Sequence, residues 1–85
     1  MRHLRTFELI EAVAELKSIR KASTMVAMTP SAVQRRIQAF EDEVGTQIFE
    51  RVSKGVELNA AGELVIDHIK KQKAEIDYLN SGDHR

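Results

Sequence analysis

The chain has 85 residues, the length of one small domain, and it contains no cysteine, which excludes disulfides, thiolate catalysis and zinc ribbons. Thirteen basic and 13 acidic residues give a formal net charge of zero, which argues against nucleic-acid binding unless positive charge gathers in one segment. No apolar run approaches the roughly 18 residues that would span a bilayer, so we expect a cytoplasmic protein.

The first predicted helix runs from about His3 to Leu16. Apolar residues recur along it at helical spacing, namely Leu4, Phe7, Ile10, Val13 and Ala14. Glutamates lie between them at positions 8, 11 and 15. This pattern is typical of an amphipathic helix that packs on a core and exposes an acidic side.

Ser18 is expected to cap a short second helix, in which Ala22, Met25 and Val26 face inward. Only a tight turn at 27–29 separates this helix from the next one, which is the connection length of a helix-turn-helix. The charged residues from position 17 to position 40 are all basic: Lys17, Arg20, Lys21, Arg35 and Arg36. Such a block favours a nucleic-acid surface, although a solvated helix face remains an alternative.

Thr29 is a good N-cap for the third helix, and Pro30 suits its first position because the missing N–H would have no helical partner. The core-facing stripe is expected to comprise Val33, Ile37, Phe40 and Val44, and Gly45 should end the helix. The opposite side carries Ser31, Arg35 and Gln38, with Gln34 and Arg36 on its flanks. Short polar residues and an arginine on an outward face are typical of a DNA recognition helix, although any capped surface helix or plain three-helix bundle shares the apolar pattern.

Two short runs with aromatic and β-branched residues, 48–52 and 56–58, flank the turn Ser53-Lys54-Gly55 and predict a β-hairpin. Arg51 and Lys54 give this hairpin positive charge, which suits a wing on phosphates or in a minor groove. An ordinary surface hairpin would carry charges as well. Phe49 is expected to pack on the core.

Asn59 is a good N-cap for a long helix from Ala60 to about Asn80, with Ser81-Gly82 ending it. One stripe of this helix has the alternating spacing of a coiled-coil seam: Val65, Ile69, Gln72, Ile76 and Leu79. Its far part should therefore pack on a second copy, unless the helix folds back on its own domain. His68 is expected on the flank of the seam, and the three scattered histidines predict no metal site.

The order of these parts resembles the N-terminal DNA-binding domain of LysR-type transcriptional regulators. The resemblance rests on L-R-T-F at 4–7, S-I-R-K-A-S at 18–23, T-P-S-A-V-Q-R-R-I-Q-A-F-E at 29–41, the family-like E-V-G and I-F-E-R between 43 and 51, and L-N-A-A-G at 58–62. It implies a mainly α fold: a winged helix-turn-helix at 1–58, a linker helix at 59–80 that forms a homodimer, and a tail at 81–85. Each copy would place its recognition helix, 30–44, in a major groove of an interrupted palindrome of double-stranded DNA, with a wing at 51–56.

The resemblance also implies contact residues. The family's base-reading positions correspond here to Pro30, Ser31, Gln34 and Arg35. The expected contacts to the DNA backbone or through the wing are Lys17, Arg20, Lys21, Thr24, Thr29, Arg36, Gln38, Arg51, Ser53 and Lys54. Many family members have serine at the position of Gln34 and glutamine at that of Pro30. These departures affect the sequence preference and not the fold.

Family members continue into a much longer effector-binding domain, so this chain is expected to be a separated or naturally short DNA-binding domain without a cofactor. A small-molecule effector would bind the missing domain, and RNA polymerase is a possible partner of the full-length parent, which would act at the bacterial nucleoid. Other possibilities stay open. They are a different winged-helix regulator resembling the molybdate-responsive repressors, or a protein-interaction module that uses the long helix. An enzyme is the weakest alternative, because the chain has no glycine-rich phosphate loop, and Glu41, Asp42 and Glu43 point in different directions around a helix.

Overall fold

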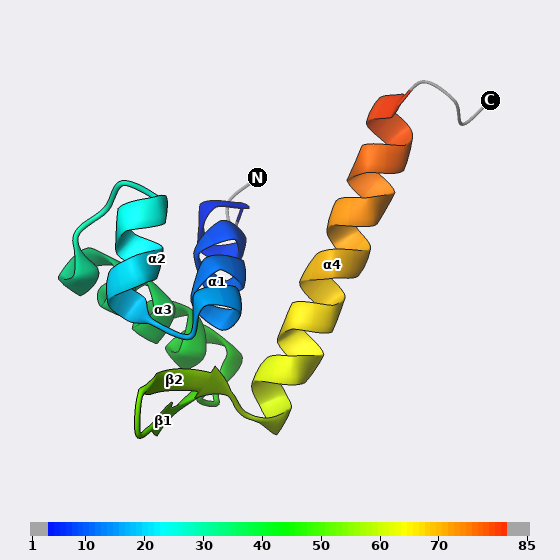
Figure 1. The fold of residues 1–85 in the computed structure, drawn as a ribbon. Helices are drawn as coiled ribbons and strands as arrows, with labels where there is room; N and C mark the ends of the chain where they lie inside the picture. The colour runs from blue at the N-terminus through cyan, green and yellow to red at the C-terminus, as the bar shows by residue number, and fades with distance from the viewer. Residues whose placement is uncertain (1–3, 82–85) are drawn as a thin grey trace.

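A computed structural model describes residues 4–81. Along the chain lie α1 (Leu4–Leu16), α2 (Ile19–Met25), α3 (Pro30–Val44), β1 (Phe49–Val52), β2 (Gly55–Leu58) and α4 (Ala60–Ser81). Three helices stand beside a two-stranded hairpin, and α4 leaves the hairpin as a long rod that runs beside α1 (Figure 1). This is the predicted mainly α winged helix-turn-helix with a long C-terminal helix. The predictions for His3, for Gly82 and for the rest of the tail lie outside the described residues, as does the side chain of Leu4.

The predicted helix ends are confirmed, because side chains and a glycine satisfy backbone groups there. The hydroxyl of Ser18 accepts the N–H of Lys21 at 3.1 Å, and that of Thr29 accepts the N–H of Ala32 at 3.1 Å. Gly45 has φ of 84° and donates its N–H to the carbonyl of Glu41 at 2.8 Å. These caps fix both ends of α3 and the start of α2.

Contacts from other parts of the fold hold the turn between α2 and α3. Ala27 takes a left-handed conformation with φ of 60°, which reverses the chain direction. Arg5 of α1 donates from Nη2 to the carbonyl of Val26 at 2.7 Å, and Met28 donates its N–H to the carbonyl of Ser23 at 2.9 Å. The turn therefore has a defined geometry that orients α3 against α2.

The buried side chains form two apolar clusters. The first joins the three helices to the hairpin and comprises Leu9, Ala12, Val13, Ala22, Val33, Ile37 and Val56. The second joins α1, α3 and α4 and comprises Ile10, Phe40, Ile48, Ile66 and Ile69. Phe49 packs against both clusters, as expected.

Two residues predicted to face the core do not. Met25 is 64% exposed and Val44 is 45% exposed. Each is the last residue of its helix, beyond the part that neighbouring elements cover. The apolar pattern of the sequence therefore extends to the last residue of each helix, although the packed part of the helix ends before it.

The hairpin has its turn at Ser53 and Lys54, and Arg51 pairs with Val56 across it. Its first strand begins at Phe49, one residue later than expected, because Ile48 is fully buried and its N–H is taken by a side chain of α3. Val56 donates its N–H to the carbonyl of Lys17 at 3.2 Å, which anchors β2 to the turn between α1 and α2. The wing is thus attached to the helical unit from both of its strands.

The first half of α4 packs on its own domain. Asn59 caps the helix by accepting the N–H of Gly62 at 2.8 Å, and Ile66 and Ile69 enter the second cluster. An ion pair of 3.3 Å between Lys73 and Glu11 ties the middle of α4 to α1. The far end of α4 extends beyond the rest of the fold (Figure 1). No helix within residues 4–81 is long and apolar enough to cross a membrane.

Candidate nucleic-acid interface

The first two turns of α3 present the four residues expected to read bases. Pro30, Ser31, Gln34 and Arg35 are all exposed, as the helical pattern predicted. The hydroxyls of Ser31 and Thr29 lie 3.5 Å apart at the start of the helix. Because the Thr29 cap and Pro30 fix this end, the small side chains hold a defined surface that a base edge can approach.

The basic side chains around this surface are not neutralised by the fold. Arg20 and Lys21 lie exposed on α2, and Arg35 and Arg36 lie exposed on α3. None of the four has an ion pair with another residue in the part of the chain that the structure describes. Residues 17–40, which include these four, contain no acidic residue, so their positive charge is available to phosphates despite the zero net charge of the chain.

The other expected backbone contacts have varied surroundings. Thr24 and Gln38 are exposed, but Thr24 donates to the carbonyl of Arg20 at 3.3 Å and Gln38 donates to Asp42 at 3.0 Å. Lys17 lies 3.9 Å from Glu57, an exposed and therefore weak ion pair. Ser53 and Lys54 form the exposed tip of the wing.

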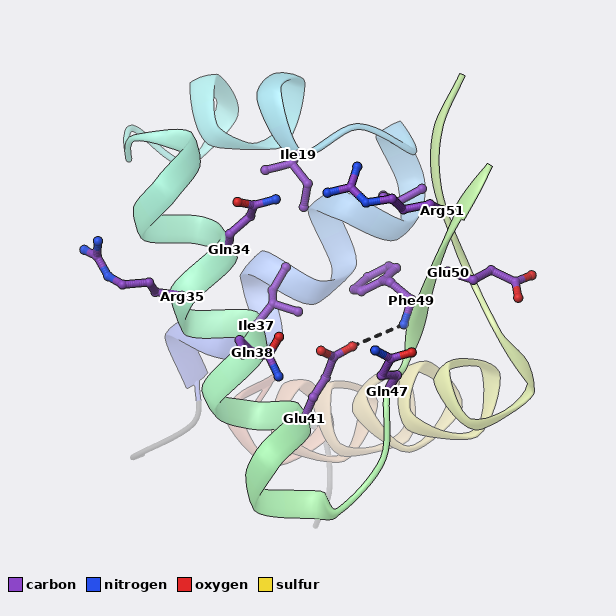
Figure 2. Close-up of a pocket in the computed structure, with 11 residues that line it drawn as sticks. Ile19, Gln34, Arg35, Ile37, Gln38, Glu41, Gln47, Phe49, Glu50 and Arg51 are labelled. Atoms are coloured by element: carbon purple, nitrogen blue, oxygen red, sulfur yellow. Dashed lines mark hydrogen bonds between the residues drawn. The ribbon is translucent and has the colours of Figure 1, made fainter. Parts of the chain in front are cut away.

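A groove of about 600 Å³ runs between α3, the start of α2 and the hairpin (Figure 2). Ile19, Ile37, Phe49 and Val56 form its apolar walls. Figure 2 shows Gln34 and Arg51 extending toward each other across one end of this groove, whereas Arg35 and Glu50 point away from it. The groove therefore brings a residue of the recognition helix and a residue of the wing to one place.

A buried carboxylate sets the distance between α3 and the hairpin. Glu41 is only 8% exposed, and its Oε2 accepts the N–H of Ile48 at 2.8 Å and that of Phe49 at 3.4 Å. From the sequence, Glu41 was considered only with Asp42 and Glu43, as carboxylates that point in different directions around a helix, and this role was not predicted. The available signal was its position next to Phe40, at the edge of the buried stripe of α3.

The stripe predicted as a dimer seam on α4 is divided between two environments. Ile69 is 1% exposed within its own domain and Val65 packs partly against the same cluster, so placing Ile69 on an open dimer face was wrong. The reason is that α4 folds back on α1 over its first half. Ile76 and Leu79, which are 38% and 58% exposed, remain open, with half-buried Gln72 at the boundary.

Comparison with known proteins decides the family. Residues 1–63 match the family model described as a bacterial regulatory helix-turn-helix protein of the lysR family. The chain belongs to the LysR family. This domain therefore has the family's helix-turn-helix, which the structure places at α2 and α3.

Individual relatives agree with this assignment. The chain is 33% identical over 73 residues to the uncharacterized HTH-type transcriptional regulator y4mQ of Sinorhizobium fredii. This match covers 86% of this chain and 24% of that protein. It is 34% identical over 68 residues to the HTH-type transcriptional regulator TfdT of Cupriavidus pinatubonensis. This match covers 80% of this chain and 30% of that protein. The chain thus spans about a quarter to a third of the length of these curated relatives.

A solved DNA complex has the same fold. The crystal structure of the CbnR DNA-binding domain with DNA matches this LysR-family domain with a TM-score of 0.81 and 28% identity, over 94% of this chain and 90% of that one. A LysR-family DNA-binding domain accounts for the winged fold, the basic segment and the outward face of α3.

Proposed function

We propose that this LysR-family domain binds double-stranded DNA in a sequence-specific manner as a homodimer. Each copy places α3 in the major groove of one half of an interrupted palindrome, and the wing at 51–56 lies on the backbone or in the minor groove. The observation that carries the proposal is the exposed basic surface of α2 and the first half of α3. Residues 17–40 include no acidic residue, and Arg20, Lys21, Arg35 and Arg36 have no ion pair within the described chain.

Arg35 is proposed as the main base-reading residue. It is exposed, points away from the domain, and can donate two hydrogen bonds to O6 and N7 of guanine, worth about 1–3 kcal/mol against a wrong base. Ser31 can bond to either a donor or an acceptor on a base edge, and Pro30 offers only apolar contact, for example to a thymine methyl. Arg20, Lys21 and Arg36 would bind phosphates and set the register of α3 without reading sequence.

The dimer is proposed to form through the far part of α4. Ile76 and Leu79 are apolar and at least 38% exposed, and a helix of this length extends past the domain that it packs on. A second copy would cover this end and hold the two recognition helices at a fixed spacing, which an interrupted palindrome requires.

Regulation by the full-length protein belongs to this proposal as well. The relatives are transcriptional regulators several times longer than the matched region, so a small-molecule effector would bind outside residues 1–85, and RNA polymerase would be a partner of the longer protein. We assign no catalytic or cofactor role to this domain, and we place its action at the bacterial nucleoid.

Sedimentation equilibrium, run beside a selection from randomised duplexes on the same protein, tests the proposal. A dimer that selects an interrupted palindrome supports the recognition surface and the dimer together. A monomer that selects no sequence would contradict both and would favour an interaction module, in which α4 binds another protein and Arg35→Ala has no effect.

A further inference from the structure

The groove between α3 and the wing is lined at one end by two polar side chains from different elements, Gln34 and Arg51, that extend toward each other. Gln34 comes from the second turn of α3 and Arg51 from the middle of β1, and both line this groove. Within residues 4–81 neither side chain has a hydrogen bond or an ion pair. Both are exposed, and Figure 2 shows them extending toward one another.

The same view separates Gln34 from Arg35. Arg35 points away from the groove, in the direction in which α3 would meet base edges, whereas Gln34 turns toward the hairpin. An amide that is to pair with adenine N6 and N7 must lie in the plane of the base, on the outward side of the recognition helix. Gln34 occupies the flank instead.

The charges at the groove favour an anion. Arg51 is the cation at this end, and the two carboxylates that line the groove do not oppose it there. Glu41 is buried and accepts the backbone N–H groups of Ile48 and Phe49, and Glu50 points out of the groove. A phosphate oxygen accepts hydrogen bonds from a guanidinium and from an amide N–H, and the guanidinium fork matches its geometry.

We propose that Gln34 does not read a base, and that Gln34 and Arg51 together hold one phosphate of the DNA strand that borders α3. This inference rests on the proposed DNA binding and assigns one of its contacts differently from the family resemblance. Base reading by α3 is then carried by Pro30, Ser31 and Arg35. The phosphate between helix and wing fixes how deeply α3 enters the major groove.

Binding of the selected palindrome to the wild type, Gln34→Ala, Arg51→Ala and the double variant tests this assignment. Each single variant should bind the palindrome about 100-fold more weakly, which is about tenfold for the one hydrogen bond to a charged group lost in each half-site, and equally so on every single-base variant of the site. Arg51→Ala should also reduce the salt slope by about 0.9 for each half-site contact. The affinity of the double variant should fall by less than the product of the two single-variant fold-losses, because both residues hold the same phosphate.

Duplexes in which one phosphate at a time is replaced by a neutral methylphosphonate identify the shared contact. Several positions should weaken the wild type, but only one in each half-site should have a smaller effect on Gln34→Ala and Arg51→Ala than on the wild type. Gln47→Ala is the matched control, since Gln47 also lines the groove but lies at its other end, beside Phe49 and away from Arg51, and it should bind as the wild type does.

The outcomes separate this inference from the proposed function. The phosphate assignment would be overturned if Gln34→Ala changed the preference at one base pair and the affinity losses of the single variants multiplied in the double variant. Selective binding by the wild type would still leave DNA recognition intact. A wild type that binds all duplexes equally would overturn sequence-specific recognition, and one that binds no duplex would overturn the phosphate assignment as well.

Discussion

The carboxylate of Glu41 accepts the backbone N–H of Ile48 at 2.8 Å, and this contact joins the recognition helix to the first residue before the wing. A second hydrogen bond, from the N–H of Phe49 at 3.4 Å, ends on the same oxygen. Both N–H groups therefore find an acceptor in the side chain of Glu41 at the start of β1. The relation between α3 and the wing, on which their proposed simultaneous contacts to DNA depend, is therefore built into the fold itself.

Glu41→Ala should lower the free energy of unfolding by about 1–3 kcal/mol, since it leaves two backbone N–H groups without their acceptor in a part-buried site. Urea unfolding followed by circular dichroism at 222 nm measures this. Asp42→Ala is the control, because Asp42 is exposed and only accepts from Gln38. Equal effects for the two variants would show that the buried carboxylate does not support the wing.

Gly62→Ala should destabilise the domain by about 3 kcal/mol, the upper part of the range for overpacking. A Cβ at this position would overlap the carbonyl oxygen of Ile48 and lie 2.7 Å from Cδ2 of Leu58. In an open helix the same change would be stabilising by up to about 1 kcal/mol, so the close approach of α4 to Ile48 reverses the sign.

Gly45→Ala provides the comparison for Gly62. Gly45 has φ of 84°, and a Cβ there would meet no atom within 4 Å, so only the backbone strain of roughly 1–2 kcal/mol should appear. Thermal unfolding of both variants at one protein concentration ranks them. Stability of Gly62→Ala at or above that of Gly45→Ala would contradict the packing described for α4.

Ala27→Gly should raise the stability of the domain or leave it unchanged, although most Ala→Gly changes lower it. Ala27 has φ of 60°, where an alanine pays about 1–2 kcal/mol that a glycine does not. This gain offsets the larger backbone entropy of glycine in the unfolded chain. Ala39→Gly, at an exposed position inside α3, should instead cost about 1 kcal/mol. Unfolding in urea distinguishes the two, and a similar loss for both would speak against the left-handed turn.

Leu79→Glu should convert the proposed dimer to a monomer without unfolding it. Leu79 is 58% exposed, so its replacement removes little packing within one copy, but it would place a charge at the interface between two copies. Affinity for a palindrome should fall about 100-fold, the lower end of what linking two binding sites contributes. Sedimentation equilibrium and anisotropy titrations measure the two effects.

Ala74→Glu is the matched control for Leu79→Glu. Ala74 is also exposed on α4 but lies on the opposite side of the helix, so it adds the same charge away from the proposed interface. It should remain dimeric. Dissociation by both variants would point to a general effect of charge on α4, and a dimer that survives Leu79→Glu would move the interface elsewhere.

Local chemistry explains which parts of the fold could be predicted from sequence. The caps at Ser18, Thr29 and Asn59 and the left-handed Gly45 depend on residues within one turn, so the sequence alone was sufficient to place them. The outward face of α3 followed from helical periodicity and is confirmed, because α3 lies between a core on one side and open solvent on the other.

Contacts between distant segments could not be predicted from the sequence. Whether Met25, Ile69 or Glu41 is buried depends on where other elements end and how far α4 covers α1, which no local pattern records. Similarly, the helical wheel placed Gln34 on a flank of α3, but only the position of the hairpin shows that this flank faces Arg51. The base and phosphate contacts themselves stay predictions.

The most direct test of the central claim is a randomised-duplex selection run in parallel on the wild type, Arg35→Ala and Lys21→Ala. We expect an interrupted palindrome for the wild type and the same palindrome for Arg35→Ala with one position of each half-site no longer specified. Lys21→Ala should retain the full preference, bind all sequences more weakly and lose about one unit of salt slope for each half-site. Equal loss on every sequence for Arg35→Ala, with no position relaxed, would contradict the assignment of α3 as the element that reads DNA.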